Sequence, residues 1–330
     1  MPNIGLIGLG AIGRVHFDIW QRSSAGKLVA VSDRHPRKLA GDWAGKDFNL
    51  GNQAQQKVDM DGLTAYEKAL DLIADPNVDI VDICMPTRHH APLTIAALRA
   101  GKHVFCEKPM ALTIAECAEM EREALAADRR LMIGHCLRYW PHYVKAHEML
   151  VSGKYGRPIY AHLFRSSPAP LWSDNDWYMK AGESGGVFDM HIHDIDVALW
   201  WFGRPREISV TGSAPDGLAM IMDAAWRYEE GLTVNLHASW DRHGGSFRHA
   251  FRLIMEKATL VYDMASDADA LHLLHGGADD RILIDTPSAY ETELNDFASS
   301  VGTPRSTRLA PAESRLAVEV GLEELRLLGV

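Results

Sequence analysis

The chain has 330 residues, of which 47% are hydrophobic and 24% charged, and its formal net charge is −10 at pH 7. This length exceeds what a single hydrophobic core usually organises, so we expect two domains. The negative charge argues against nucleic acid or an anionic membrane as a partner, and no apolar run approaches the roughly 20 residues of a membrane-spanning helix.

The cysteines and the first residues of the chain predict a cytoplasmic protein. The four cysteines include no C-x-x-C pair, and two of them lie in apolar runs typical of buried strands. The opening stretch MPNIGLIGLGAIG has no basic leader, and glycines interrupt its apolar run, which is not the pattern of a signal peptide. We therefore expect reduced structural thiols rather than disulfides.

Short apolar runs alternate with helical stretches over residues 1–135, which predicts a parallel sheet covered on both faces. The expected strands are 3–10, 27–33, 79–86, 102–109 and 130–136. The expected helices are 11–22, 36–45, 91–101 and 113–128. Residues 45–62 have little pattern and are expected to form a loop.

Beyond about residue 139 the pattern changes to several strand-like runs, which favours a mainly antiparallel sheet. The expected strands are 157–166, 207–214, 219–228, 232–240 and 251–263, and the expected helices are 141–156, 291–301 and 312–328. We therefore predict an α/β protein with an N-terminal Rossmann domain over 1–135. An α+β domain over 136–330 would carry a large, mainly antiparallel open sheet.

The segment GLGAIG supplies Gly8, Gly10 and Gly13 between an expected strand and an expected helix. Such glycines allow a tight turn, a close approach of pyrophosphate to the backbone, and close packing of helix on strand. Asp33 ends the next strand, where a carboxylate binds the ribose hydroxyls of NAD, although Arg34 leaves NADP open. A flavin site, an S-adenosylmethionine site or a plain glycine turn are the alternatives.

The segment GVFDMHIHDID concentrates polar residues in an apolar stretch. On a helix, Asp189 and His193 lie four residues apart on one face, Asp196 follows on that face, and His191 points to the opposite side. An acid–base pair, a structural polar stripe and a metal site remain open. The metal site requires a strand, so that both histidines face the same way, and further ligands elsewhere.

A cation for such a pair is available in the segment CEKP, where Lys108 follows an expected Rossmann strand. Ligands of open α/β sheets bind at that edge. A cis Lys108–Pro109 bond would aim the ammonium group into the cleft. The alternative for a lysine in such a loop is a solvated charge.

Four segments occur in this order: GLGAIGRVH, DICMPTRHHAP, AGKHVFCEKPMA and SGGVFDMHIHDIDVALWWFG. Together they resemble the Gfo/Idh/MocA family, named for glucose–fructose oxidoreductase, inositol dehydrogenase and MocA, over nearly the whole chain. The combination of E-K-P with D-x-x-x-H carries most of the resemblance, and it implies Lys108, Asp189 and His193 as the catalytic residues. The family often has T-P-N-x-x-H where this chain has Thr87 and Arg88, with His90 matching the family histidine.

The resemblance implies an NAD(P)-dependent dehydrogenase that transfers a hydride between a secondary hydroxyl of a sugar or inositol-like polyol and nicotinamide, with His193 as acid and base. The expected cofactor is NAD, with NADP possible. The expected cofactor-binding residues are Gly8, Gly10, Ala11, Ile12, Gly13, Asp33, Arg34, Pro86, Thr87, His90, Glu107 and Lys108. The expected substrate-binding residues are Lys108, His135, Arg138, Trp172, Trp177, Asp189 and His193, and no metal is expected.

Two other functions on the same fold stay open: an NAD-dependent glycosidase, which oxidises a sugar only transiently, and a non-catalytic regulator that senses a sugar. We expect a small-molecule substrate and neither a nucleic-acid nor a membrane partner. An uncovered sheet face would expose apolar side chains, so we also expect a homo-oligomer, a dimer or a tetramer, through the C-terminal sheet.

Overall fold

The computed structural model describes residues 1–43, 57–171, 174–180, 186–241 and 245–330. The chain divides into two compact units. The first unit comprises Met1–Cys136, Trp172–Asn175 and Tyr290–Arg315, and the second comprises Leu137–Leu171, Asp176–Ala289 and Leu316–Val330. Most of the expected loop over 45–62 falls outside the described residues.

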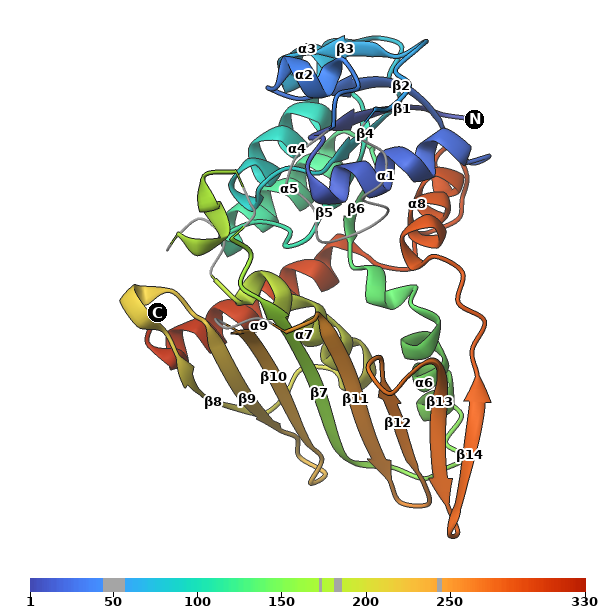
Figure 1. Cartoon of the computed structure of the whole chain (residues 1–330), viewed down its shortest axis with the longest axis vertical. Helices are drawn as coiled ribbons and strands as arrows, with labels where there is room; N and C mark the ends of the chain where they lie inside the picture. The colour runs from blue at the N-terminus through green and yellow to red at the C-terminus, as the bar shows by residue number, and fades with distance from the viewer. Residues whose placement is uncertain (44–56, 172–173, 181–185, 242–244) are drawn as a thin grey trace. The chain divides into compact units, whose positions relative to one another are not determined.

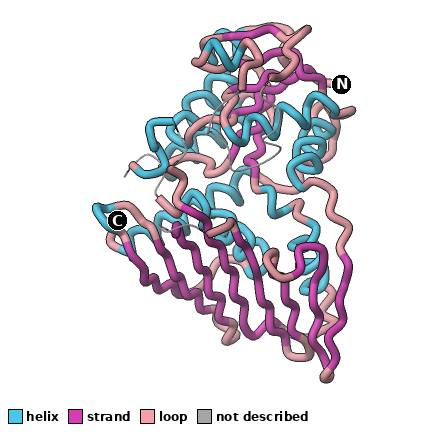
Figure 2. The backbone as a smooth tube through the Cα atoms, in the orientation of Figure 1, coloured by secondary structure: helices cyan, strands magenta, loops and turns pink. Residues whose placement is uncertain are grey.

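The first unit contains a six-stranded sheet in the order β3-β2-β1-β4-β5-β6 (Figures 1 and 2). Its strands are β1 (Asn3–Ile7), β2 (Lys27–Ser32), β3 (Thr64–Tyr66), β4 (Ile80–Ile83), β5 (His103–Glu107) and β6 (Leu131–Gly134). Every neighbouring pair is parallel. The order reverses between β1 and β4, and ligands of doubly wound sheets bind beyond the strand ends at such a reversal.

The first unit also contains several helices. They are α1 (Ala11–Arg22), α2 (Pro36–Leu39), α3 (Ala69–Ala74), α4 (His90–Arg99), α5 (Ile114–Ala126) and α8 (Ala289–Ser300), with the 3₁₀ turn η1 (Thr87–His89). The predicted helix over 36–45 is wrong over 40–43, because α2 ends at Leu39; residues 44–45 lie outside the described residues. The chain turns at Gly41, where φ is +76° and a Cβ would lie 2.2 Å from the carbonyl oxygen of Val58.

The second unit is built on an eight-stranded sheet in the order β14-β13-β12-β11-β7-β10-β9-β8 (Figure 1). Its strands are β7 (Pro158–Pro168), β8 (Glu207–Ser213), β9 (Ile221–Arg227), β10 (Thr233–Asp241), β11 (Arg248–Met255), β12 (Thr259–Asp263), β13 (Asp267–His275) and β14 (Ala278–Leu283). The pair β7–β10 is parallel and the other pairs are antiparallel. The predicted mainly antiparallel sheet is therefore confirmed.

One face of this sheet is covered by helices. They are α6 (Pro141–Val151), α7 (Phe188–Phe202) and α9 (Pro311–Leu328), and their apolar side chains share one core with alternate residues of the strands. The turns η2 (Cys136–Arg138), η3 (Asp174–Met179) and η4 (Pro215–Gly217) complete the described elements. None of the described helices is long and apolar enough to cross a membrane.

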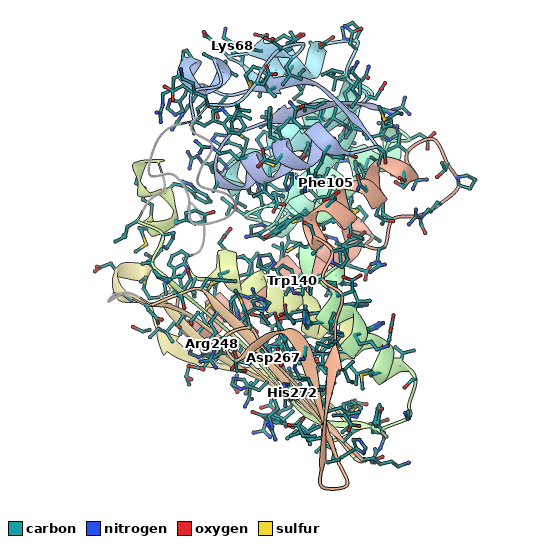
Figure 3. All side chains as sticks on the ribbon, turned by 45° about the vertical axis from the view of Figure 1, so that its right-hand side comes forward. Lys68, Phe105, Trp140, Arg248, Asp267 and His272 are labelled. Atoms are coloured by element: carbon teal, nitrogen blue, oxygen red, sulfur yellow. The ribbon has the colours of Figure 1, made fainter. Side chains whose placement is uncertain are left out.

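The other face of the sheet differs from the expected apolar surface. His162 and Phe164 alternate with buried core residues of β7, and the Phe164 ring stacks on His237 with centroids 5.0 Å apart. Charged side chains such as Asp223 also lie on this face, where His237 Nδ1 is 2.7 Å from the Asp223 carboxylate. Further charged groups come from β11 and β13, which carry the labelled Arg248, Asp267 and His272 (Figure 3). Strict alternation puts the apolar residues inward and leaves a mixed outer face.

Candidate active site

The glycine turn between β1 and α1 has the backbone form that a dinucleotide site requires. Gly8 has φ +94°, and a Cβ there would lie 2.4 Å from the carbonyl oxygen of Cys84. A Cβ on Gly13 would lie 1.8 Å from the Gly8 carbonyl oxygen, so helix and turn can touch only without a side chain. A Cβ on Gly10 would meet no atom of the described residues within 4 Å. The first amides of α1, including those of Ala11 and Ile12, therefore border open space beside a positive helix end.

Asp33 is held at the end of β2 by backbone amides. Leu9 N–H donates to its Oδ2 and His35 N–H to its Oδ1, both at 2.9 Å. A carboxylate accepts about four hydrogen bonds, so this anchored group retains acceptor capacity for a ribose diol. The guanidinium of the neighbouring Arg34 contacts the His35 ring, with Nε 3.2 Å from its Nε2.

His90 braces two loops of the first unit. The side chain is 1% exposed, with Nδ1 2.7 Å from the carbonyl oxygen of Pro109 and Nε2 2.7 Å from that of Met85. Each ring nitrogen of His90 thus faces a backbone carbonyl, one from each loop. Pro86 and the buried Thr87 begin η1 between these loops. The geometry of His90 is that of a support beneath the candidate cofactor residues.

Lys108 follows β5 directly and is half-buried. Its peptide bond to Pro109 is cis, as the sequence allowed. The Lys108 backbone N–H lies 3.2 Å from Oε2 of Glu107, whose side chain is 5% exposed. The carboxylate of Glu107 thus folds back onto the backbone amide of Lys108.

Sequence reasoning missed His16 and Asp82, which join Glu107 in the core of this unit. His16 Nδ1 lies 3.0 Å from Asp82 Oδ2, and His16 Nε2 lies 3.2 Å from Glu107 Oε1. The signal was present as a histidine on the apolar face of the first helix and an aspartate inside an apolar strand. Polar residues at core positions are informative because they need partners there.

In the second unit, the segment with Asp189 and His193 is the helix α7. Asp189 lies in its first turn and is 8% exposed, and His193 is half-buried one turn further on. The entry to the helix is fixed by Gly186, whose φ is +67° and where a Cβ would lie 2.3 Å from the carbonyl oxygen of Ala219. The expected shared face of Asp189 and His193 follows from this helical geometry.

The other two aspartates of α7 form buried ion pairs. Arg165 Nε and Nη2 each donate to Asp194 at 2.9 Å, and Arg138 Nε and Nη2 each donate to Asp196 at 2.9 Å. All four side chains are at most 4% exposed. Arg138 was expected to bind substrate, but its guanidinium is bound in two places to Asp196. Such bidentate pairs fix the rotation of the helix that carries His193.

His191 faces the core on the side opposite the catalytic candidates, as predicted. Its Nε2 lies 2.8 Å from Glu324 Oε2, and Trp226 Nε1–H donates to Glu324 Oε1 at 2.6 Å. Because the segment is helical, the interpretation of His191 and His193 as a same-side metal pair is wrong. The alternative of a structural role fits His191, Asp194 and Asp196, because each of them is paired with a buried side chain.

The remaining substrate candidates are placed one by one. His135 follows β6 in the first unit and is 1% exposed. Trp177 belongs to the second unit and stacks on Tyr178, with centroids 3.7 Å apart. Trp172 lies outside the described residues. The role of all three in substrate binding stays a prediction.

Comparison with known proteins decides the family. A model described as an oxidoreductase family with an NAD-binding Rossmann fold matches residues 2–135, and a GFO/IDH/MocA C-terminal domain model matches residues 143–261. The chain belongs to the Gfo/Idh/MocA family. The first unit therefore contains the NAD-binding Rossmann domain of this family, and the expected fold class is confirmed.

Individual members of the Gfo/Idh/MocA family resemble the chain over different lengths. A myo-inositol 2-dehydrogenase from Thermotoga maritima is 35% identical over 64% of this chain, and that match spans 58% of the relative. A 1,5-anhydro-D-fructose reductase from Ensifer adhaerens is 27% identical over 93% of this chain and 91% of the relative. A solved structure of a probable dehydrogenase from Thermotoga maritima is 26% identical, with a TM-score of 0.79 over 99% of this chain and 96% of that one.

Proposed function

We propose that this chain is an NAD-dependent dehydrogenase that oxidises a secondary hydroxyl of a cyclic polyol or sugar, with inositols as the first candidates. The observation that carries the proposal is the set of three side chains shared with the family pattern: Lys108 directly after β5, and Asp189 with His193 on one face of α7. Relatives named for inositol and anhydrosugar chemistry support the substrate class.

The first unit has the groups that NAD needs. The open backbone beside Gly10 and the free end of α1 suit a pyrophosphate, and the anchored carboxylate of Asp33 suits a ribose diol. When bound, the nicotinamide supplies the two-electron acceptor for the hydrogen on the carbinol carbon. The protein residues then manage position, charge and the remaining proton.

His193 accepts the hydroxyl proton, so that the carbinol oxygen becomes a carbonyl oxygen as the carbon is oxidised. Lys108 donates to that oxygen and stabilises the negative charge that develops on it. Asp189, on the same face of α7 as His193, orients the hydroxyl group and the imidazole. One positioned acid–base group typically contributes about 10²–10⁴-fold to the rate.

We further propose a cytoplasmic homo-oligomer, a dimer or tetramer formed through the outer face of the C-terminal sheet. The four cysteines, Cys84, Cys106, Cys117 and Cys136, are buried and form no disulfide bonds, which suits a reducing compartment. The stacked pair of Phe164 and His237 supplies an aromatic centre on that face, and the charged groups around it supply a polar rim.

The test is NADH formation, followed by absorbance, with inositols, aldoses and anhydrosugars and with NAD and NADP in parallel. We expect NADH with one class of polyol and a fall of about 10²–10⁴-fold in kcat for His193→Ala. His275 lies on β13, next to the edge strand β14, and its side chain is 41% exposed; the control variant His275→Ala should keep full turnover. Tight NAD binding without net NADH would contradict the proposal, and chromatographic analysis of products would then identify a glycosidase.

A further inference from the structure

A buried histidine connects the helix of the glycine turn to the loop of Lys108. His16 lies on α1, one turn after Gly13, and is 1% exposed. Its ring spans two strands, with Nδ1 3.0 Å from Asp82 on β4 and Nε2 3.2 Å from Glu107 at the end of β5. This side chain of α1 therefore connects the helix to two neighbouring strands, β4 and β5, and β4 borders the reversal point of the sheet.

The contacts of His16 with Asp82 and Glu107 are strengthened by the opposite charges of the imidazole and the two carboxylates. Burial alone would lower the pKa of His16, but Asp82 and Cys84 beside the ring together hold that pKa well above its ordinary value. Burial would likewise raise the pKa of Glu107, and the hydrogen bond and charge of His16 lower it instead. A charged imidazole therefore pairs with both carboxylates at once, through a hydrogen bond to Asp82 and an ion pair with Glu107.

The surroundings keep the ring in place. Trp20 Nε1–H donates to Asp82 Oδ2 at 2.7 Å, the Cys84 Sγ lies 3.2 Å from His16 Nδ1, and Phe105 packs edge-on with centroids 5.6 Å away. Phe105 is labelled on the sheet of this unit in Figure 3. This enclosed packing leaves the imidazole little freedom to turn.

The same atoms do not call for a metal ion. Donor atoms of His16, Asp82 and Cys84 lie within 4.8 Å of one another. They already hydrogen-bond to each other, and Asp82 also accepts from Trp20. A metal would need a deprotonated His16 nitrogen and a thiolate, whereas burial strongly raises the pKa of the Cys84 thiol. The cluster is a hydrogen-bonded network.

The carboxylate of Glu107 connects His16 to the backbone of Lys108. Its Oε1 faces Gly134 on the paired strand β6, where a Cβ would lie only 2.8 Å away, so the missing side chain makes room for it. Its Oε2 lies 3.2 Å from the Lys108 backbone N–H. On the far side of Lys108, His90 holds the Pro109 carbonyl. The lysine is thus bracketed by groups tied to buried histidines.

We propose that His16 is a positioning residue that fixes Lys108 through Glu107 and so couples the glycine-turn helix to the catalytic lysine. This inference rests on the proposed function, in which Lys108 binds the reacting oxygen. The two contacts of His16 then have different roles. The contact of Nε2 with Glu107 affects kcat, and the contact of Nδ1 with Asp82 affects the stability of the fold.

Two conservative variants separate these bonds. The side-chain amide of His16→Gln reaches the position of Nε2 and keeps the Glu107 contact, while that of His16→Asn reaches the position of Nδ1 and keeps the Asp82 contact. We expect kcat to fall roughly 10²-fold in His16→Asn, as misplacement by about 1 Å can cause, and to stay within about threefold in His16→Gln. Both variants lose one bond of a buried ion pair, so both should melt at lower temperature than the wild type.

A purely structural role would make kcat follow the melting temperature in both variants, and that result would overturn the proposal. A readout without substrate is hydrogen exchange at the Lys108 amide. We expect exchange about tenfold faster in His16→Asn and within about threefold of wild type in His16→Gln. The His103 amide, at the opposite end of β5, is the internal reference. If the wild type turns over no polyol, the proposed function fails, and the exchange rates still decide whether His16 holds the Lys108 loop.

Discussion

Asp33 shows how one side chain prepares a cofactor site before the cofactor binds. Two backbone amides, from Leu9 in the glycine turn and from His35, fix its carboxylate in place. A fixed negative charge accepts the ribose hydroxyls of NAD and repels the additional phosphate of NADP. Preference for NAD is therefore expected to depend on this carboxylate, even though Arg34 stands next to it.

Asp33→Ala should shift cofactor preference toward NADP. We expect KM for NAD to rise about tenfold, because a charge-assisted hydrogen bond is lost. KM for NADP should fall, because the repulsion is removed and Arg34 remains. Parallel measurements of kcat/KM with both cofactors check this, and an unchanged ratio would show that Asp33 does not select the cofactor.

At the scale of elements, the helix α7 was predictable from sequence and its anchoring was not. The four-residue spacing of Asp189 and His193 predicts a shared helix face from local geometry alone. The partners that fix the helix, Arg138, Arg165 and Glu324, come from 58, 29 and 133 residues away in the chain. No local pattern connects such positions, so the sequence does not predict the ion pair of Arg138 with Asp196.

The sequence predicts the buried strands better than the strands at a sheet edge. Apolar runs such as β4 and β5 were found because both faces of a parallel sheet are buried. The hairpin of β13 and β14 was missed, because β14 is a sheet edge with mostly exposed polar residues and has no apolar run. The pattern of apolar residues thus predicts strands that pack in the core and does not predict strands at the edge of the sheet.

Asp189→Asn and Asp194→Asn form a matched pair on α7 with opposite expected effects. Asp194→Asn removes one partner of a buried ion pair and leaves Arg165 with an uncompensated charge, so we expect a loss of about 3–5 kcal/mol in the free energy of unfolding. Asp189→Asn, in the proposed active site, should lower kcat by about 10²-fold or more with a much smaller loss of stability. Denaturant unfolding and steady-state kinetics on both variants separate the roles. Equal losses of stability would contradict this division.

At the scale of the whole molecule, burial acts differently on His16 of the first unit and on His142 and His249 of the second. In the first unit, His16 is paired with carboxylates, and its pKa is raised despite burial. In the second, burial lowers the pKa of His142 to about 4 and that of His249 well below its usual range. Acid should therefore destabilise the second unit through these neutral rings, while the His16 network keeps its charge as the pH falls.

The sign of the effect follows from proton uptake by the unfolded chain. His142 packs on Tyr262, with ring centroids 4.3 Å apart, and stays neutral in the folded state until the pH approaches 4. The unfolded chain binds this proton near pH 6.5. Stability is therefore complete above about pH 6.5 and is lost as the pH falls toward 4, at a rate of at most about 1.4 kcal/mol per pH unit for one group.

His142→Phe should remove this part of the acid sensitivity, because a phenyl ring keeps the stacking on Tyr262 and takes up no proton. Between pH 8 and pH 5 we expect the wild type to lose about 2 kcal/mol more unfolding free energy than the variant. Denaturant unfolding followed by circular dichroism at both pH values gives this difference directly. His249 is unchanged in the variant, so some loss should persist. Identical losses in both proteins would mean that His142 is protonated in the folded state, or that its ring reaches water well before unfolding.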